Sequence, residues 1–121
     1  MKDILQKYGL NTLTKKILLD LYKSMLRIRM FEEKIVELYP EQEMKCPVHL
    51  CIGQEAIAAG VCAHLDKGDY VFSNHRGHGH CLAKGTQMRP LMAEFYGKVT
   101  GCSGGKGGSM HLTSVEHGVM G

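Results

Sequence analysis

The chain has 121 residues, of which 44% are hydrophobic and 22% charged, so it is long enough for one domain and is not disordered throughout. Fifteen lysine and arginine residues against twelve acidic residues give a net charge of +3. Because the basic residues are dispersed along the chain, this excess does not indicate a protein that binds nucleic acid.

The first part of the chain is dominated by one predicted helix. Residues 1–13 are polar and contain Gly9 and Asn11, so we expect an irregular segment. Apolar residues then recur every three or four positions, which predicts a long helix over residues 14–39 with Thr14 as its N-cap and Pro40 as its stop. Residues 40–50 are expected to form a loop or a short strand.

The second part of the chain contains shorter predicted elements and most of the glycine. Periodicity and turn residues predict three helices and one buried strand, namely helices over residues 53–65, 77–84 and 88–96 and a strand over residues 70–73. The glycine-rich residues 101–121 lack periodicity and predict an ordered loop whose backbone closely approaches another group.

The cysteines and the apolar segments bear on the location of the protein. Five cysteines occur at irregular spacing, and no apolar run approaches the length that crosses a membrane. The first residues lack the apolar stretch of a signal peptide. We therefore expect a cytoplasmic protein with reduced thiols and no membrane association.

A histidine-rich run, Asn74-His-Arg-Gly-His-Gly-His80, directly follows the predicted strand. A strand that leads through a glycine-containing turn into a helix is a common ligand position in α/β folds. Arg76 offers a planar set of donors that suits phosphate, and Gly77 allows backbone amides to come close to it. The run is therefore either an anion site, for a diphosphate in particular, or a solvated basic loop with one or two histidines in the core.

Two further patterns argue against a zinc site and against a nucleotide-triphosphate loop. The residues Cys46-Pro-Val-His-Leu-Cys51 are of types that bind zinc, but no second pair with zinc spacing follows, so no metal site is predicted. The glycine-rich run at residues 104–108 lacks the spacing of a nucleotide-triphosphate loop, because Lys106 is followed by Gly107. The role of His49 remains open: it is either a packed histidine or a general acid or base.

Five blocks of sequence, in unbroken order, resemble the alpha subunits of thiamine-diphosphate-dependent 2-oxo acid dehydrogenases, the family that includes pyruvate, branched-chain 2-oxo acid and acetoin dehydrogenases. The blocks are Leu21-Tyr22 with Met25-Leu-Arg-Ile-Arg-Met-Phe-Glu-Glu33, His49-Leu-Cys-Ile-Gly-Gln-Glu-Ala56, His75-Arg-Gly-His-Gly-His80, Met92-Ala-Glu-Phe-Tyr-Gly97 and Gly105-Lys-Gly-Gly-Ser-Met-His111. Many pyruvate enzymes have tyrosine at the position of His75, so the histidine-rich run is more similar to the acetoin branch.

The resemblance implies a fold and a set of site residues. The fold would be α/β, the N-terminal part of a thiamine-diphosphate-binding fold with a parallel sheet flanked by helices, and helix-rich in this chain. His49 matches the family's histidine in the substrate pocket, a catalytic position. His75 and Arg76 match the pair that binds the cofactor diphosphate. By the same matching, His78, Ser109 and His111 would line the cofactor cleft.

The resemblance also implies partners and an incomplete site. The family pairs an alpha subunit with a beta subunit in a heterotetramer and delivers an acyl group from a 2-oxo acid or acetoin to a lipoyl-bearing acyltransferase. The family's Gly-Asp-Gly motif, which holds magnesium on the diphosphate, is missing from residues 1–121. We therefore expect residues 1–121 to be an incomplete N-terminal portion, inactive alone. The alternative is a truncated paralogue or split-gene product that serves as an assembly or interaction module.

Overall fold

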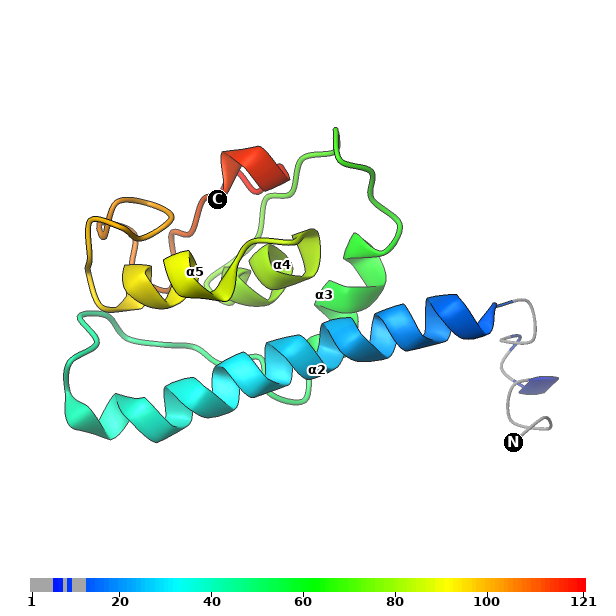
Figure 1. Cartoon of the computed structure of the whole chain (residues 1–121), viewed down its shortest axis with the longest axis horizontal. Coiled ribbons are helices and arrows are strands. Elements are labelled where there is room, and N and C mark those ends of the chain that lie inside the picture. The colour runs from blue at the N-terminus through cyan, green and yellow to red at the C-terminus, as the bar shows by residue number, and fades with distance from the viewer. Residues whose placement is uncertain (1–5, 8, 10–12) are drawn as a thin grey trace.

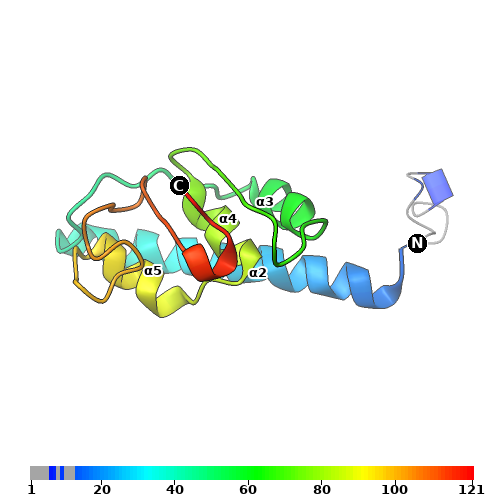
Figure 2. The same cartoon turned by 90° about the horizontal axis from the view of Figure 1, so that it is seen from above.

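Three short helices lie along one side of a long one (Figure 1). A computed structural model describes residues 6, 7, 9 and 13–121. The long helix is α2 (Lys15–Leu38), and the short ones are α3 (Glu55–Cys62), α4 (Gly77–Lys84) and α5 (Met88–Phe95). The described residues also contain two helical turns, η2 (Tyr39–Glu41) and η3 (Val115–His117). Helix α2 contacts α3 and α4, which also contact each other, as Figure 2 shows from above.

Helix α2 carries one face of the core. Its N-terminus is capped by the Thr14 hydroxyl, which accepts a hydrogen bond from the backbone N–H of Ile17 at 3.3 Å. The buried residues Ile28, Phe31 and Ile35 recur at helical spacing, and the Phe31 ring meets the Phe95 ring of α5 edge to face with centroids 5.8 Å apart. The helix lies one residue inside the predicted range of 14–39 at each end.

The short helices follow the sequence expectation to different degrees. Helix α4 has the predicted bounds and ends at Gly85, whose φ of +111° favours glycine. Helix α5 ends one residue before the predicted end. Helix α3 is shorter than predicted, because Gly53 has a φ of +85° and the chain leaves the helix after Cys62. Of the predicted irregular segment 1–13, only residues 6, 7, 9 and 13 are described, and residues 6 and 7 are helical.

The prediction of a buried strand over residues 70–73 is wrong. Val71 alone is buried, whereas the side chains of Tyr70 and Phe72 are 69% and 77% exposed. Val71 forms a parallel bridge to Val119, with its N–H donating to Gly118 O at 2.8 Å. Alternate side chains of extended backbone point to opposite faces, so only one of the three apolar residues reaches the core. Within the described residues the fold is helix-rich, and parallel pairing is limited to this bridge.

None of the described helices combines the length and the apolar character needed to cross a membrane.

Candidate functional site

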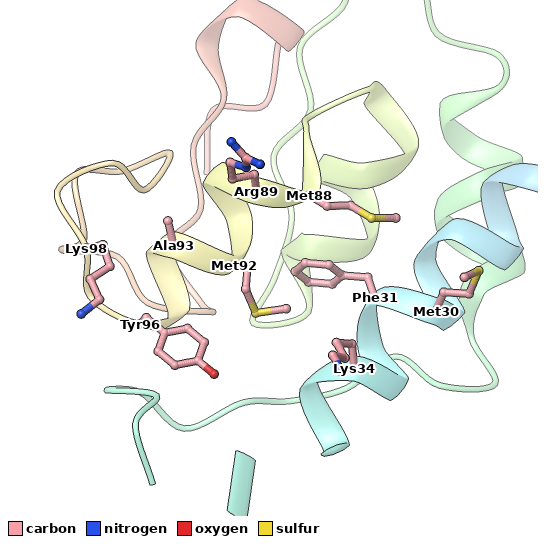
Figure 3. A pocket seen from close by; sticks show the side chains of 9 residues that line it. All are labelled: Met30, Phe31, Lys34, Met88, Arg89, Met92, Ala93, Tyr96 and Lys98. Carbon is pink, nitrogen blue, oxygen red and sulfur yellow. The ribbon is translucent and has the colours of Figure 1, made fainter. Parts of the chain in front are cut away.

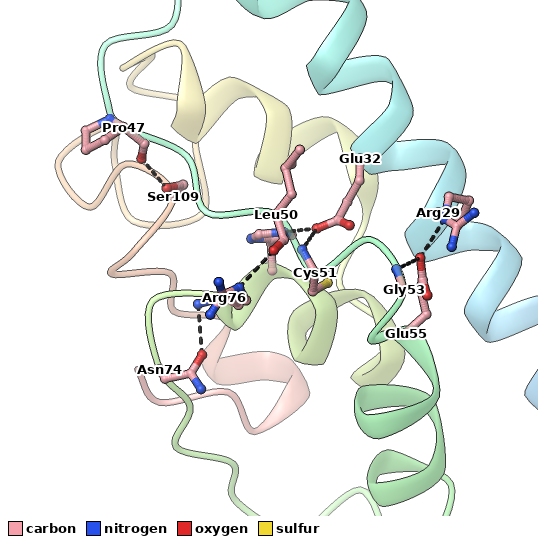
Figure 4. A network of polar contacts seen from close by, with 11 residues as sticks. Arg29, Glu32, Pro47, Leu50, Cys51, Gly53, Glu55, Asn74, Arg76 and Ser109 are labelled. Atoms are coloured by element: carbon pink, nitrogen blue, oxygen red, sulfur yellow. Dashed lines mark hydrogen bonds and ion pairs between the residues drawn. The ribbon is translucent and has the colours of Figure 1, made fainter.

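The segments that carry His49 and Arg76 adjoin each other. The Arg76 guanidinium donates from Nε to the carbonyl of Leu50 at 2.8 Å (Figure 4). Its Nη1 lies 2.8 Å from His75 Nε2. Because arginine has only donors, His75 Nε2 accepts this bond and the ring proton is on Nδ1. The Arg76 backbone N–H donates to the Asn74 side chain at 2.9 Å, which closes the turn before α4.

The two exposed histidines of this site touch. The rings of His49 and His75 meet edge to face with their centroids 4.8 Å apart. Arg76, His75 and His49 therefore form a continuous surface, with a half-buried guanidinium at one end and an exposed imidazole at the other. Of the predicted site residues, these three are the ones that the structure brings together.

His78 does not line a cleft. Its ring is fully buried and donates a hydrogen bond from Nε2 to Glu32 Oε1 of α2. The same Glu32 oxygen accepts the backbone N–H of Cys51 at 2.7 Å (Figure 4). Burial opposes ionisation of Glu32, but the bonds from His78 and Cys51 outweigh it and lower the pKa of this carboxyl. The predicted role of His78 is corrected accordingly, because the residue faces the core.

Glu32, Cys51 and His78 are also the described group whose residue types could hold a metal ion. One ligand atom of each lies within 4.8 Å of the others, and all three residues are buried. Burial, followed by the neighbouring Glu32, raises the pKa of the Cys51 thiol, which keeps it protonated. Since Glu32 and His78 contact each other directly, the group acts as a hydrogen-bonded cluster and we assign it no metal function.

The glycine-rich loop wraps around a buried carboxylate. Glu94 of α5 is fully buried and accepts the backbone N–H groups of Ser103 and Gly105 on Oε2, at 2.8 Å each, and that of Gly107 on Oε1 at 2.7 Å. Burial opposes ionisation of Glu94, but these amides outweigh it and lower its pKa. The predicted close approach of this loop to another group is thus an approach to the protein's own side chain.

The end of this loop is attached to the segment that carries His49. Ser109 is fully buried and its hydroxyl donates to the carbonyl of Pro47 at 2.7 Å (Figure 4). Ser109 therefore braces the loop and does not line a cleft, which corrects its predicted place. His111 is exposed, and its place in a cofactor cleft stays a prediction.

Two neighbouring glycines provide a matched test of the close packing in this loop. Gly104 and Gly105 have φ of +67° and +76°, but a Cβ on Gly104 meets no atom within 4 Å, whereas one on Gly105 would lie 2.7 Å from backbone atoms of Gly97 and Lys98. We expect Gly104→Ala to destabilise the protein by about 1 kcal/mol through φ alone. Gly105→Ala should cost about 1–3 kcal/mol more through overpacking.

The measurement is the difference in thermal midpoint between the two variants of the protein. Equal midpoints would show that the loop is not packed against residues 97–98 as the structure has it.

Comparison with known protein families identifies the family to which this chain belongs. The sequence model of the dehydrogenase E1 component family matches residues 22–121. The chain belongs to this family. The resemblance inferred from the five sequence blocks is thereby confirmed.

Three similar members of the E1 family have names that refer to different substrates, acetoin or pyruvate. The alpha subunit of acetoin:2,6-dichlorophenolindophenol oxidoreductase from Bacillus subtilis (strain 168) is 49% identical over 118 residues, covering 98% of this chain and 35% of the relative. Its namesake from Cupriavidus necator is 45% identical over 109 residues, covering 90% and 33%. The pyruvate dehydrogenase E1 component subunit alpha of Porphyra purpurea is 49% identical over 109 residues, covering 90% and 32%. The chain thus spans about a third of the length of these relatives.

Two buried acids of this E1 chain escaped the sequence interpretation. Glu32 stands four residues after Ile28 and Glu94 three after Leu91, so both occupy positions of the apolar face of their helix. An acidic residue in an apolar stripe is the signal that could have found them, because such a residue is buried only with partners. Glu55 shows the same pattern: it is buried at the start of α3 and accepts Arg29 Nε at 2.6 Å and the Gly53 N–H at 3.0 Å (Figure 4).

An apolar groove of the E1 chain lies apart from these residues. It has a volume of about 680 Å³ and is formed by facing side chains of α2 and α5, as Figure 3 shows. Methionine, aromatic and basic side chains line it, among them Met30, Met92, Tyr96 and Lys34. None of the candidate site residues lines this groove, so the groove is not the candidate catalytic site.

Proposed function

We propose that the chain is the N-terminal part of the alpha subunit of a thiamine-diphosphate-dependent dehydrogenase. The complete enzyme would decarboxylate a 2-oxo acid or cleave acetoin and pass the acyl group to a lipoyl carrier. The observation that carries the proposal is the continuous arrangement of Arg76, His75 and His49 on adjoining loops of an E1 chain.

The residues present fit a diphosphate-bearing cofactor. Arg76 is half-buried, and within the described residues no carboxylate forms an ion pair with it and no hydrogen bond occupies its Nη2. Its other two nitrogens are held by Leu50 and His75, so the guanidinium has a fixed orientation before any ligand arrives. A preoriented arginine with a free donor edge suits a phosphate oxygen.

His49 supplies the proton-transfer group of the proposal. Its imidazole is exposed beside His75, where a substrate at the cofactor would meet it. When bound, thiamine diphosphate supplies the nucleophile and the electron sink for cleavage of a bond next to a carbonyl. In this scheme His49 donates a proton to, or accepts one from, the substrate oxygen, and Arg76 holds the diphosphate in place.

Membership of the family supports a proposal for the partners. We propose a beta subunit that completes a heterotetramer, and a lipoyl-bearing acyltransferase as the acceptor. Residues 1–121 contain no Gly-Asp-Gly motif, so magnesium would be held by residues outside this sequence, and residues 1–121 alone would be inactive. We also propose that the Val71–Val119 pairing is the first part of a parallel sheet in the complete subunit. The five free cysteines support a cytoplasmic location.

The second candidate is a non-catalytic module that only assembles with other chains. The apolar groove between α2 and α5 and the exposed side chains of Phe72 and Val99, at 77% and 85%, favour it, because such surface is usually covered by another polypeptide. A module of this kind would associate with partners and bind no cofactor.

One assay separates the two candidates. The full-length subunit, produced with its partner subunit, is supplied with thiamine diphosphate and magnesium and assayed with acetoin and with pyruvate, using 2,6-dichlorophenolindophenol as the electron acceptor. The first candidate predicts cofactor-dependent dye reduction with at least one substrate. A folded assembly that binds no cofactor and reduces no dye favours the module.

A further inference from the structure

One buried carboxylate joins the three segments on which the candidate site rests. Glu32 projects from α2, His78 from α4, and Cys51 belongs to the irregular segment between α2 and α3. Glu32 Oε1 accepts two hydrogen bonds, one from His78 Nε2 and one from the Cys51 backbone N–H at 2.7 Å. The side chains of Glu32 and His78 are both fully buried. This single oxygen therefore sets where residue 51 lies relative to two helices.

The segment held in this way carries both candidate groups. His49 stands two residues before Cys51, and the carbonyl of Leu50 receives Arg76 Nε at 2.8 Å. Because residues 49–51 form no helix or strand, their position depends on bonds to other elements. Displacing the Cys51 amide would move the Leu50 carbonyl and with it the orientation of the Arg76 guanidinium.

A buried polar pair at this place is not explained by stability alone. Apolar side chains of similar volume often stabilise a core as well as a buried ion pair does. Here the polar pair leaves Glu32 Oε2 and His78 Nδ1 without hydrogen-bond partners among the described residues. A core that tolerates such atoms next to candidate site residues indicates that the pair has another task.

We propose that Glu32 is a positioning residue: its carboxylate, paired with His78, holds the Cys51 amide and thereby fixes His49 and Arg76 relative to α2 and α4. This inference rests on the proposed function. The positioning role requires that the Glu32 side chain is long enough to reach Cys51, whereas the negative charge of Glu32 is secondary.

Two conservative variants separate reach from charge. Glu32→Asp keeps the carboxylate but shortens the side chain, so it no longer spans to Cys51. Glu32→Gln keeps the length and an acceptor oxygen but removes the charge. We expect Glu32→Asp to raise the Kd for thiamine diphosphate and to lower kcat at saturating cofactor, each by about ten-fold, because a misplacement of about 1 Å can cost up to 100-fold. Glu32→Gln should stay within about two-fold of wild type in both, since the acceptor is retained.

The measurements are made on the full-length subunit assembled with its partner subunit, by calorimetric titration of thiamine diphosphate with magnesium, by steady-state kinetics and by thermal melting. Glu37→Gln, an exposed acid on the same helix, serves as the control and should match wild type. A merely structural role would lower the thermal midpoint of Glu32→Asp and leave its Kd and kcat unchanged, which overturns the proposal. Equal impairment of Glu32→Gln and Glu32→Asp also overturns it.

A third variant covers the case in which Glu32→Asp does not fold. The double variant Glu32→Leu/His78→Leu replaces the pair by apolar side chains, which a core accepts, but leaves the Cys51 amide without its acceptor. It should fold and bind the cofactor about ten-fold more weakly. Wild-type affinity in this variant would contradict the positioning role. If wild type itself binds no thiamine diphosphate, the proposed function fails and the inference falls with it, whereas unchanged variants of a binding wild type refute only the inference.

Discussion

Replacing Arg76 with alanine is expected to raise the Kd for thiamine diphosphate at least ten-fold, because a charge-assisted contact contributes roughly 1.5–3 kcal/mol. The structure gives this arginine two fixed neighbours and no acidic partner among the described residues, so the contact is ready for an anion. The loss should appear in the cofactor Kd and should leave the substrate KM at saturating cofactor little changed. Calorimetric titration of the proposed complete alpha subunit, assembled with the proposed beta subunit, measures it.

Matched variants distinguish charge from geometry at this position. Arg76→Lys keeps the charge but cannot donate to Leu50, His75 and a phosphate in one plane, so we expect it to recover only part of the affinity. Lys23→Ala removes one positive charge from the exposed face of α2 and should bind the cofactor as wild type does. An Arg76→Ala protein with wild-type affinity would remove Arg76 from the site.

Loss of the Glu94 carboxylate is expected to have the largest effect on stability. Glu94→Ala leaves three backbone N–H groups of the glycine-rich loop without an acceptor, and each unpaired buried group costs about 1–3 kcal/mol. Because the three act together, we expect a total of about 3–5 kcal/mol. Glu94→Gln keeps one acceptor oxygen and should lose about half as much.

Hydrogen exchange locates this effect. The amides of Ser103, Gly105 and Gly107 should exchange faster than in wild type in both variants, and faster in Glu94→Ala than in Glu94→Gln. Glu43→Gln, an exposed acid outside the loop, should show wild-type exchange. Protection of the three amides in Glu94→Ala equal to that in wild type would contradict the hydrogen bonds described here.

The lowered pKa of Glu94 also predicts a dependence on pH. A carboxyl whose pKa is lower in the folded state contributes stability that is present above its ordinary value of 4.5 and is lost as pH falls through the folded value. Wild type should therefore lose more stability than Glu94→Gln on acidification below that value, and the gap between their thermal midpoints should narrow. A gap that stays constant with pH would show that Glu94 is not ionised in the folded protein.

Local signals in the sequence were sufficient to identify the family and to predict the bounds of α2, α4 and α5 to within one residue. Gly85 ends α4 because its positive φ suits glycine, and the spacing of Ile28, Phe31 and Ile35 identifies the buried face of α2. The strand prediction failed at Tyr70 and Phe72 because residue type does not reveal whether a partner strand covers both faces.

The prediction of the site rests on the positions where residue type and motif agree. Arg76 was predicted to bind a diphosphate from its donor geometry and its place in the histidine-rich run; the structure sets it against Leu50 and His75, and its role in binding stays a prediction. A histidine in the core was one of the two alternatives for the histidine-rich run, but which histidine it is, and the burial of Ser109, could not be foreseen, because the partners Glu32 and Pro47 are distant in sequence. Tertiary contacts of this kind leave only an indirect trace, such as an acid on an apolar helix face.

The most direct test of the proposed function is a titration of the full-length subunit, assembled with its partner subunit, with thiamine diphosphate in the presence of magnesium. We predict saturable binding of the cofactor that is weakened at least ten-fold by Arg76→Ala. A folded wild-type assembly that shows no saturable binding would contradict the assignment of this chain to a thiamine-diphosphate-dependent dehydrogenase.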